Sequence, residues 1–126
     1  MNENEISKIV VDAGLKVHRT LGPGLLESAY EACLYHELCS RHLQVEKQKP
    51  IPLVYQGVQL EVGYRIDLLV ENKLVVEIIA VDALHVIHRA QILNYLRLSN
   101  CKLGLLINFN TVLFKEGVKR FIIGKI

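Results

Sequence analysis

Two almost wholly apolar segments follow one another near the middle of the chain, and they constrain its fold more than any other feature. Residues 64–70 (Tyr-Arg-Ile-Asp-Leu-Leu-Val) and 74–79 (Leu-Val-Val-Glu-Ile-Ile) are separated only by Glu71-Asn72-Lys73. Short apolar runs of this kind, bounded by a polar turn, are typical of paired strands. Because neither run alternates polar and apolar positions, both faces of the hairpin must be covered. The sequence therefore predicts a sheet packed between other layers of structure.

An acid interrupts each of these strands, Asp67 in the first and Glu77 in the second. Aspartate is depleted in strands, and a buried unpaired carboxylate usually becomes neutral, pairs with a cation or binds a metal. If the turn centres on Asn72, the two acids face each other directly across the hairpin. A divalent cation between them would remove their repulsion. The alternative, which the strands alone favour equally, is a pair of acids near a sheet edge, each held by an arginine, a lysine or a backbone donor.

The segments around the hairpin define the fold class. Apolar residues at spacings of three and four predict an amphipathic helix over residues 3–20, which Gly22-Pro23-Gly24 ends. Helix, strand and helix again in one continuous chain predict a single α/β domain over residues 1–126, with a sheet covered by helices on its faces. Two further helices are expected over residues 25–41 and 84–98. Strands are expected over 44–49 and 51–61, which Pro50 and Pro52 interrupt and which turn at Gln56-Gly57, and over 102–107. Edge pieces are expected over 110–114 and 118–123.

Composition excludes some classes of protein and leaves others open. Hydrophobic residues make up 51% of the chain, enough for a substantial core, and no apolar run approaches the roughly 18 residues needed to cross a bilayer. The polar first residues are unlike a secretory signal, and Cys33, Cys39 and Cys101 have no metal-binding spacing, so we expect a reduced cytoplasmic protein without a membrane span. A net charge of +2, with scattered basic residues, permits a nucleic-acid partner without requiring one.

Two further pairs of polar residues each share a helical face. Glu27 and Tyr30 lie three residues apart in the second predicted helix, and Gln91 and Tyr95 lie four apart in the third. Spacing alone favours ordinary roles for both pairs, a solvated glutamate beside a tyrosine at the core edge and a polar pair at a helix rim. His88 is likewise expected at a solvated helix start, with only a weak case for a role near a site.

Taken in order, these residues resemble a known protein family. Residues 24–30 (Gly-Leu-Leu-Glu-Ser-Ala-Tyr) are similar to the signature of the GxxExxY family, and the resemblance runs from about residue 6 to residue 121. That family resembles the PD-(D/E)XK nuclease superfamily and, in its Gln-x-x-x-Tyr motif, the RecB-like exonuclease branch. The segments that carry the resemblance are 21–24, 64–70, 76–78, 90–95 and 104–109.

The resemblance implies a restriction-endonuclease-like core, in which a mixed, centrally parallel sheet is flanked by helices. It makes Asp67 the acid of the first half-motif and Glu77 the acid of the second, with Glu27 as the helical acid that completes a metal site. The backbone carbonyl of Ile78 would be a further oxygen ligand. Oxygen ligands of this kind suit Mg²⁺ or Mn²⁺.

The same resemblance implies a substrate and a reaction. Gln91 and Tyr95 match the helical Gln-x-x-x-Tyr motif, which helps to position the substrate and the site. A metal held by the acids would polarise a phosphodiester and lower the pKa of a bound water. The resemblance therefore implies metal-dependent hydrolysis of a nucleic-acid phosphodiester, in DNA or RNA.

The chain departs from the family at one position that matters for catalysis. Where the second half-motif is Glu-x-Lys, this chain has Glu77-Ile78-Ile79. Ile79 lies two residues after Glu77 and so points to the same face of the strand. An apolar side chain thus replaces the ammonium that should orient water and offset phosphate charge, and such a loss commonly lowers the rate about 10²–10⁴-fold.

Several explanations of this departure stay open. A lysine on another strand has taken over the role, with Lys47, Lys49 and Lys102 as candidates. Alternatively, the chain has lost catalysis and acts as a nuclease-like binding module for nucleic acid or protein, in a homo-oligomer. As a third case, Ile79 abolishes activity in this chain alone. A weaker hypothesis gives the acids a role only in stability.

Overall fold

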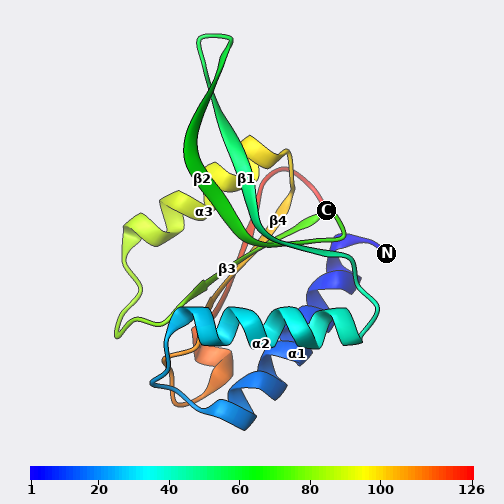
Figure 1. The fold of residues 1–126 in the computed structure, drawn as a ribbon, viewed down its shortest axis with the longest axis vertical. Helices are drawn as coiled ribbons and strands as arrows, with labels where there is room; N and C mark the ends of the chain where they lie inside the picture. Colours follow the sequence, from blue (N-terminus) through cyan, green and yellow to red (C-terminus); the bar gives the residue numbers. More distant parts are fainter.

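The computed structural model describes residues 1–126, and a five-stranded sheet lies at its centre (Figure 1). The strands follow one another across the sheet in chain order. The central pair, β3 and β4, is parallel, and every other neighbouring pair is antiparallel, which confirms the predicted mixed, centrally parallel sheet. The strands are β1 (Val45–Tyr55), β2 (Val58–Val70), β3 (Leu74–Ile79), β4 (Leu103–Asn108) and β5 (Val118–Ile122).

Helices cover both faces of this sheet, as the apolar strands require. α1 (Glu3–Leu21) and α2 (Glu27–Ser40) pack on one face, and α3 (Val86–Ser99) packs on the other. Alternate residues of β3 point into the two cores, Val76 toward α1 and α2 and Val75 toward α3. A short 3-10 helix, η1 (Phe114–Gly117), leads into β5.

The structure corrects the expected strand boundaries. Residues 58–61 and 64–70 belong to one long strand, β2, and the two prolines do not interrupt β1. β1 is an edge strand, where a proline's missing donor can face solvent, and Pro52 lies at a register shift between Ile51 and Leu53. Residues 110–114 form no strand, because side chains such as Thr111 bond locally to the backbone and compete with a ladder.

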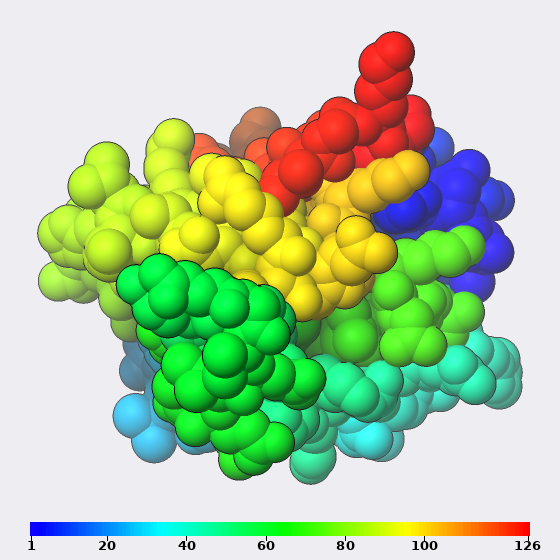
Figure 2. All heavy atoms as spheres, turned by 90° about the horizontal axis from the view of Figure 1, so that it is seen from above, coloured from blue at the N-terminus to red at the C-terminus, as the bar shows by residue number.

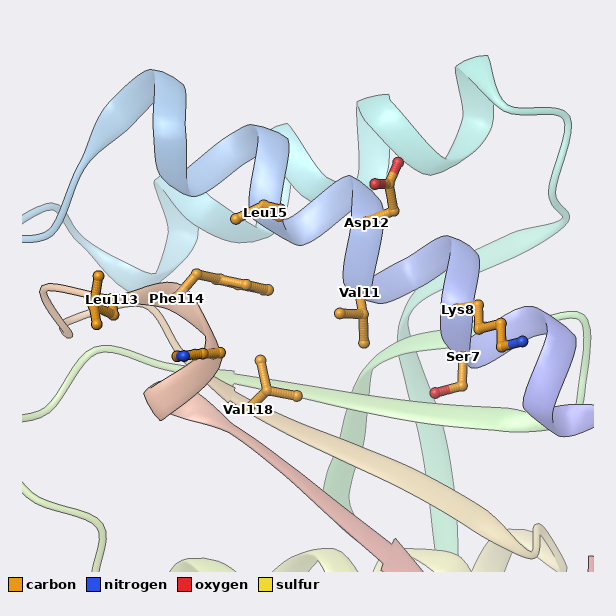
Figure 3. Close-up of a pocket in the computed structure, with 9 residues that line it drawn as sticks. Ser7, Lys8, Val11, Asp12, Leu15, Leu113, Phe114 and Val118 are labelled. Carbon is orange, nitrogen blue, oxygen red and sulfur yellow. The ribbon is translucent and has the colours of Figure 1, made fainter.

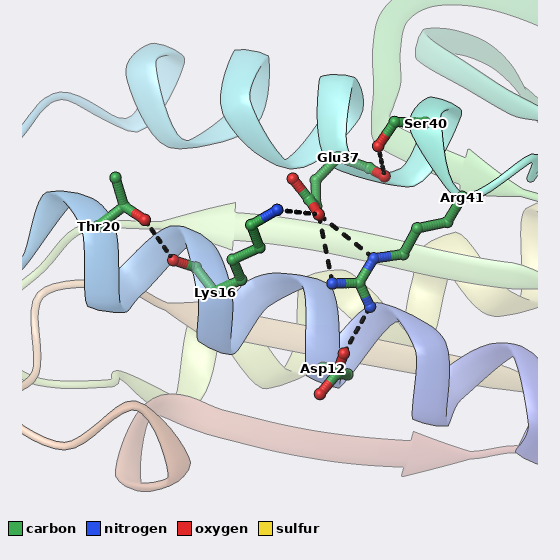
Figure 4. A network of polar contacts seen from close by, with 6 residues as sticks. All are labelled: Asp12, Lys16, Thr20, Glu37, Ser40 and Arg41. Atoms are coloured by element: carbon green, nitrogen blue, oxygen red, sulfur yellow. Dashed lines mark hydrogen bonds and ion pairs between the residues drawn. The ribbon is translucent and has the colours of Figure 1, made fainter.

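A polar network joins α1 and α2 on their solvent side (Figure 4). Arg41, which follows α2, donates to Asp12 of α1 at 2.6 Å and to Glu37 of α2 at 3.3 Å. Glu37 also pairs with Lys16 of α1 at 3.1 Å. A charge shared among several partners constrains geometry more than an isolated surface pair does. The network therefore holds α2, and with it Glu27, in register with α1.

Tyr30 fixes the loop that leads into α2. Its side chain is fully buried and its ring stacks on Phe109, with centroids 4.5 Å apart. Its hydroxyl donates to the Gly22 carbonyl at 2.6 Å and accepts from the Leu25 N–H at 3.1 Å. Gly24, within this loop, has a φ of 99°, which side chains rarely adopt. Spacing suggested a tyrosine at the core edge, but Tyr30 is a buried anchor for the residues before Glu27.

We predict that Tyr30→Phe lowers the free energy of unfolding by about 1–3 kcal/mol, because it leaves the Leu25 N–H and the Gly22 carbonyl without their buried partner. Urea unfolding followed by circular dichroism would measure this change. Tyr55→Phe is the matched control, since the Tyr55 ring is exposed and its loss of a hydroxyl should change stability by less than about 0.5 kcal/mol. Equal stabilities for the two variants would contradict the anchoring role.

Candidate functional site

The two strand acids lie where β2 and β3 separate. The ladder between these strands ends at the pair Leu68 and Val76, so Asp67 and Glu77 are the next opposed residues, as predicted. The Asp67 N–H donates to Oε2 of Glu77, and the Ile78 N–H donates to Oδ2 of Asp67, both at 2.8 Å. Side-chain oxygens thus take the place of backbone carbonyls at the end of the ladder. Backbone donors hold both acids, and no arginine or lysine forms a salt bridge with either.

Glu27 joins this group from the other side of the fork. It is the first residue of α2, and its Oε2 accepts from the Ala80 N–H at 3.1 Å, just beyond β3. Amides two residues apart point to the same edge of an extended strand, about 7 Å apart. Glu27 and Asp67 therefore bind successive amides, those of Ala80 and Ile78, along one edge of the chain.

Three residues of this region were missed by the sequence analysis. Gln48 of β1 donates to Asp67 at 3.2 Å and to Glu31 at 2.6 Å, so Glu31 is a fourth acid of the group. Glu31 lies one helical turn after Glu27, a spacing that could have found it. Gln48 gave no such signal, because its position depends on a left-handed backbone conformation, φ 52°. Asn108, at the end of β4, bonds to both backbone groups of Val81 and fixes the segment after β3.

Burial dominates the electrostatics of the acids. Glu77 is only 7% exposed, and burial, reinforced by the charge of Asp67, raises its pKa to about 9. Burial also raises the pKa of Asp67, with a smaller contribution from Glu27, and it raises the pKa of Glu31. Neither Asp67 nor Glu77 has a compensating cation, although Lys47 partly offsets the charge of Glu31. Glu77 is therefore protonated in the folded chain at neutral pH.

Two small clefts meet at these acids. The larger, of about 280 Å³, lies between the sheet and α3, and the smaller, of about 190 Å³, lies beside α2 and includes Glu31 and Gln48. Both clefts are bordered by Glu27, Asp67 and Ile78. All the residues that the resemblance assigned to the site border the larger cleft: Glu27, Asp67, Glu77, Ile78, Gln91 and Tyr95.

Gln91 and Tyr95 form a pair on α3, at the rim of the larger cleft. The Gln91 side-chain amide donates to the Tyr95 hydroxyl at 3.0 Å. Tyr95 is buried, and burial raises the pKa of its hydroxyl. The hydroxyl therefore stays protonated at neutral pH and can donate to a group in the cleft.

The chemistry of these donors fits a hard divalent cation. Carboxylates without a counter-cation are the ligands that such ions take up. The Ile78 carbonyl adds a further oxygen, because the N–H and C=O of a strand residue point to the same edge. Glu27, Asp67 and Glu77 each accept a hydrogen bond from a backbone amide. In this arrangement no three Asp, Glu, His or Cys side chains lie close enough together to bind one metal ion. The assignment of Glu27, Asp67, Glu77 and Ile78 as metal ligands therefore stays a prediction.

None of the three candidate lysines borders either cleft. Lys47 lies over the ring of Tyr35, 4.9 Å from its centroid, and Lys49 pairs with Glu46. Lys102 immediately precedes the first residue of β4, whereas Asn108, near the site, is the last residue of that strand. A lysine that has moved among these positions is thus not supported by the structure.

The cationic and hydrogen-bonding groups that do border the larger cleft are Arg65 and His88. Nδ1 of His88 accepts from the His85 N–H at 3.2 Å, so the neutral ring carries its proton on Nε2. Arg65 donates to the Gln48 carbonyl at 3.3 Å. Ile79 also borders the cleft, and it packs against the core beneath α3.

A larger hollow lies elsewhere on the molecule, between α1 and η1 (Figure 3). It measures about 770 Å³, and its walls are mainly apolar, with Val11 and Leu15 facing Phe114 and Val118. No histidine, cysteine or glutamate lines it. Size alone would select this hollow, but the three acids of the site and the Gln91–Tyr95 pair border the cleft between the sheet and α3.

Comparison with known families identifies the superfamily of the chain. The sequence pattern of the PD-(D/E)XK nuclease superfamily matches residues 4–121. The chain belongs to the PD-(D/E)XK nuclease superfamily. No curated protein and no solved structure gives a significant match. The chain is therefore nuclease-like. None of its helices combines the length and apolar character needed to cross a bilayer.

We predict that Glu77→Gln removes a strong pH dependence of stability. The folded pKa of about 9 exceeds the unfolded value of 4.5, so the folded chain holds the extra proton between these values. The contribution of Glu77 to stability is therefore greatest below about pH 4.5 and falls as the pH rises toward 9. Without metal, Glu77→Gln should be more stable than the parent by roughly 2–4 kcal/mol near pH 8 and about equal to it near pH 5.

Urea unfolding in EDTA, at intervals from pH 5 to pH 9, measures this difference. Glu61→Gln is the control, because Glu61 is exposed on β2 and its substitution should leave the profile unchanged. Parallel profiles for the parent and Glu77→Gln would show that Glu77 does not titrate abnormally.

Proposed function

We propose that this chain is a GxxExxY-type, RecB-like nuclease that binds nucleic acid in the larger cleft and hydrolyses it with Mg²⁺ or Mn²⁺, at a rate reduced by Ile79. The observation that carries the proposal is the buried Glu77 paired with the half-buried Asp67 at the β2–β3 fork, with no arginine or lysine in a salt bridge to either. Gln91 and Tyr95 border the same cleft. A pair of acids of this kind destabilises the fold on its own, as Glu77 titrates near 9. Its presence is explained if a cation compensates the charge.

The metal would be held by Glu27, Asp67, Glu77 and the Ile78 carbonyl, and when bound it would polarise the phosphodiester and lower the pKa of water. Glu77 gives up its proton on binding, because a ligand carboxyl must be ionised. Glu27 is exposed and held by a single amide, so it is the ligand best able to change partners. Asp67 and Glu77 are already fixed by the strands.

Other residues of the cleft suit recognition of a phosphate. The Arg65 guanidinium can pair with a phosphate oxygen, and Nε2–H of His88 can donate to one. Both lie in the cleft that Ile79 deprives of an ammonium, and the Arg65 guanidinium offsets part of the missing charge. The Tyr95 hydroxyl, oriented by Gln91, supplies a third donor.

A second candidate function is a nuclease-like binding module without catalysis. Ile79 favours it, because this side chain packs into the core beneath α3 instead of presenting charge to the cleft. Such a module would keep the metal or the nucleic acid and leave the phosphodiester intact.

We predict that Mn²⁺ binding, measured by calorimetry, strengthens with pH. Because Glu77 must lose a proton whose pKa is about 9, the affinity should rise about tenfold per pH unit between pH 6.5 and 8.5. Asp67→Asn should weaken binding at least tenfold at pH 8, whereas Glu61→Gln should leave it unchanged. Binding that Asp67→Asn does not affect would place the metal elsewhere.

We also predict that Ile79→Lys increases cleavage of nucleic acid by about 10²–10⁴-fold. The assay offers single- and double-stranded DNA and RNA with Mg²⁺ or Mn²⁺, and the double variant Ile79→Lys/Asp67→Asn must be inactive. Cleavage by the parent that Asp67→Asn abolishes would support the nuclease over the binding module. If only Ile79→Lys cleaves, the binding module is correct. If neither cleaves although both bind Mn²⁺, the proposed hydrolysis is wrong.

A further inference from the structure

The outer half of the β1–β2 hairpin stands away from the rest of the molecule as an arm (Figure 1). We use this name for residues 53–64, which follow the last buried residue of β1, Ile51, and precede the next buried residue of β2, Ile66. Most of these side chains are exposed. An isolated two-stranded ribbon is at best marginally stable in water, so an arm of this length is expected to gain from a contact.

The arm has one apolar face. Leu53 lies opposite Leu60, and Tyr55 lies opposite Val58, and cross-strand partners share a face of the ribbon. Tyr64, opposite the buried Ile51, continues this face toward the body of the molecule. The other face is more polar, with Gln59 opposite Val54 and Arg65 opposite Pro50. The arm is therefore amphipathic, although neither of its faces is covered.

A groove runs between this apolar face and α3. It measures about 510 Å³ and is bordered by Leu53 and Tyr64 of the arm and by Ile87, Ala90 and Leu98 of α3. Figure 2, which looks down on the molecule from above, shows the arm (green) standing beside α3 (yellow-green to yellow). The same side of the molecule thus carries a projecting apolar ridge and an apolar recess next to it.

The exposed apolar area suits a protein interface of ordinary size. Tyr55, Val58, Leu60, Tyr64 and Ile87 are each between 40% and 66% exposed. Together they offer roughly 400 Å² of apolar surface. About 60% of the surface buried in an interface is apolar, so this apolar area corresponds to a total buried surface of roughly 600–700 Å² on each copy. A pair of copies would then bury about 1,200–1,400 Å², which lies within the range of stable interfaces.

We propose that a second copy of this chain covers the patch, with the arm of each copy lying in the groove of the other. A two-fold dimer requires a surface that is complementary to itself, and a ridge beside a recess of the same apolar character meets this requirement. Nucleic acid is a poorer occupant, because Arg97 is the only charged residue that borders the groove and phosphates need a concentrated positive surface.

The dimer would place the arm of one copy beside the acid cleft of the other. Gln91 and Tyr95 border both the groove and the larger cleft. The partner's arm therefore forms part of the rim past which a substrate strand must enter. This inference is independent of catalysis, since the patch would join two copies of an active or an inactive chain equally.

Sedimentation equilibrium between about 5 and 200 µM tests the proposal. The parent is expected to be a dimer in this range, and Leu60→Asp, on the apolar face of the arm, is expected to be monomeric. Gln59→Asp is the matched control, since it adds the same charge at the neighbouring position on the opposite face and should stay dimeric. Circular dichroism must show the same melting behaviour for the two variants as monomers at low concentration.

Ile87→Asp, on the α3 side of the groove, tests the other half of the contact and should also give monomers. A parent that is monomeric at 200 µM would overturn the proposal. So would a dimer that neither Leu60→Asp nor Ile87→Asp dissociates, because the hollow between α1 and η1 would then be the better interface. A monomeric parent that binds single-stranded DNA and loses this binding with Leu60→Asp would assign the patch to nucleic acid instead.

Discussion

The exchange of hydrogen bonds between Asp67 and Glu77 and the opposing backbone is the contact on which the arrangement of this molecule depends. At the β2–β3 fork each carboxyl accepts an amide proton that a carbonyl would accept in a continuous ladder. The two strands can therefore diverge without leaving these amides unpaired, and their divergence opens the space that the clefts occupy. The same contact brings two acids together in a poorly solvated place, and this accounts for the raised pKa of Glu77.

The surrounding layers are arranged to hold that fork from both sides. On one side, Tyr30 fixes the loop before Glu27, while Arg41 and Lys16 tie α2 to α1. On the other side, α3 presents Gln91 and Tyr95 to the cleft. The residues of the GxxExxY-like segment thus have different tasks, since Glu27 faces the site and Tyr30 anchors the helix that carries it. A tyrosine with an anchoring role is easily mistaken for a catalytic one when only its spacing is known.

The sequence predicted the sheet and the acids because both depend on local pattern. The apolar runs at 64–70 and 74–79 required a covered hairpin, and Asp67 and Glu77 stood out against them. The turn of the arm at Gln56-Gly57 was predicted and is confirmed. The continuity of β2 was not predicted, since two separate strands were expected where β2 runs from Val58 to Val70. Gln48 and Asn108 were also missed, since their contacts join segments that meet only in the folded chain. The place of Arg65 and His88 at the cleft likewise required the packing of α3 against the sheet.

The order of the strands has a consequence for how the chain folds. All four strand pairs join neighbours in sequence, and only the β3–β4 pair needs a crossover, which α3 supplies. The β2–β3 hairpin can therefore form from local contacts before α3 packs against it, since local pairings close at a low entropic cost. Until α3 packs, Glu77 stays hydrated and ionised, so its protonation belongs to the late step in which that helix closes the cleft. The docking of α3 should thus be the most pH-sensitive local opening of the native chain, and a cation bound at the fork would change the rate of that opening more than that of any other part of the sheet.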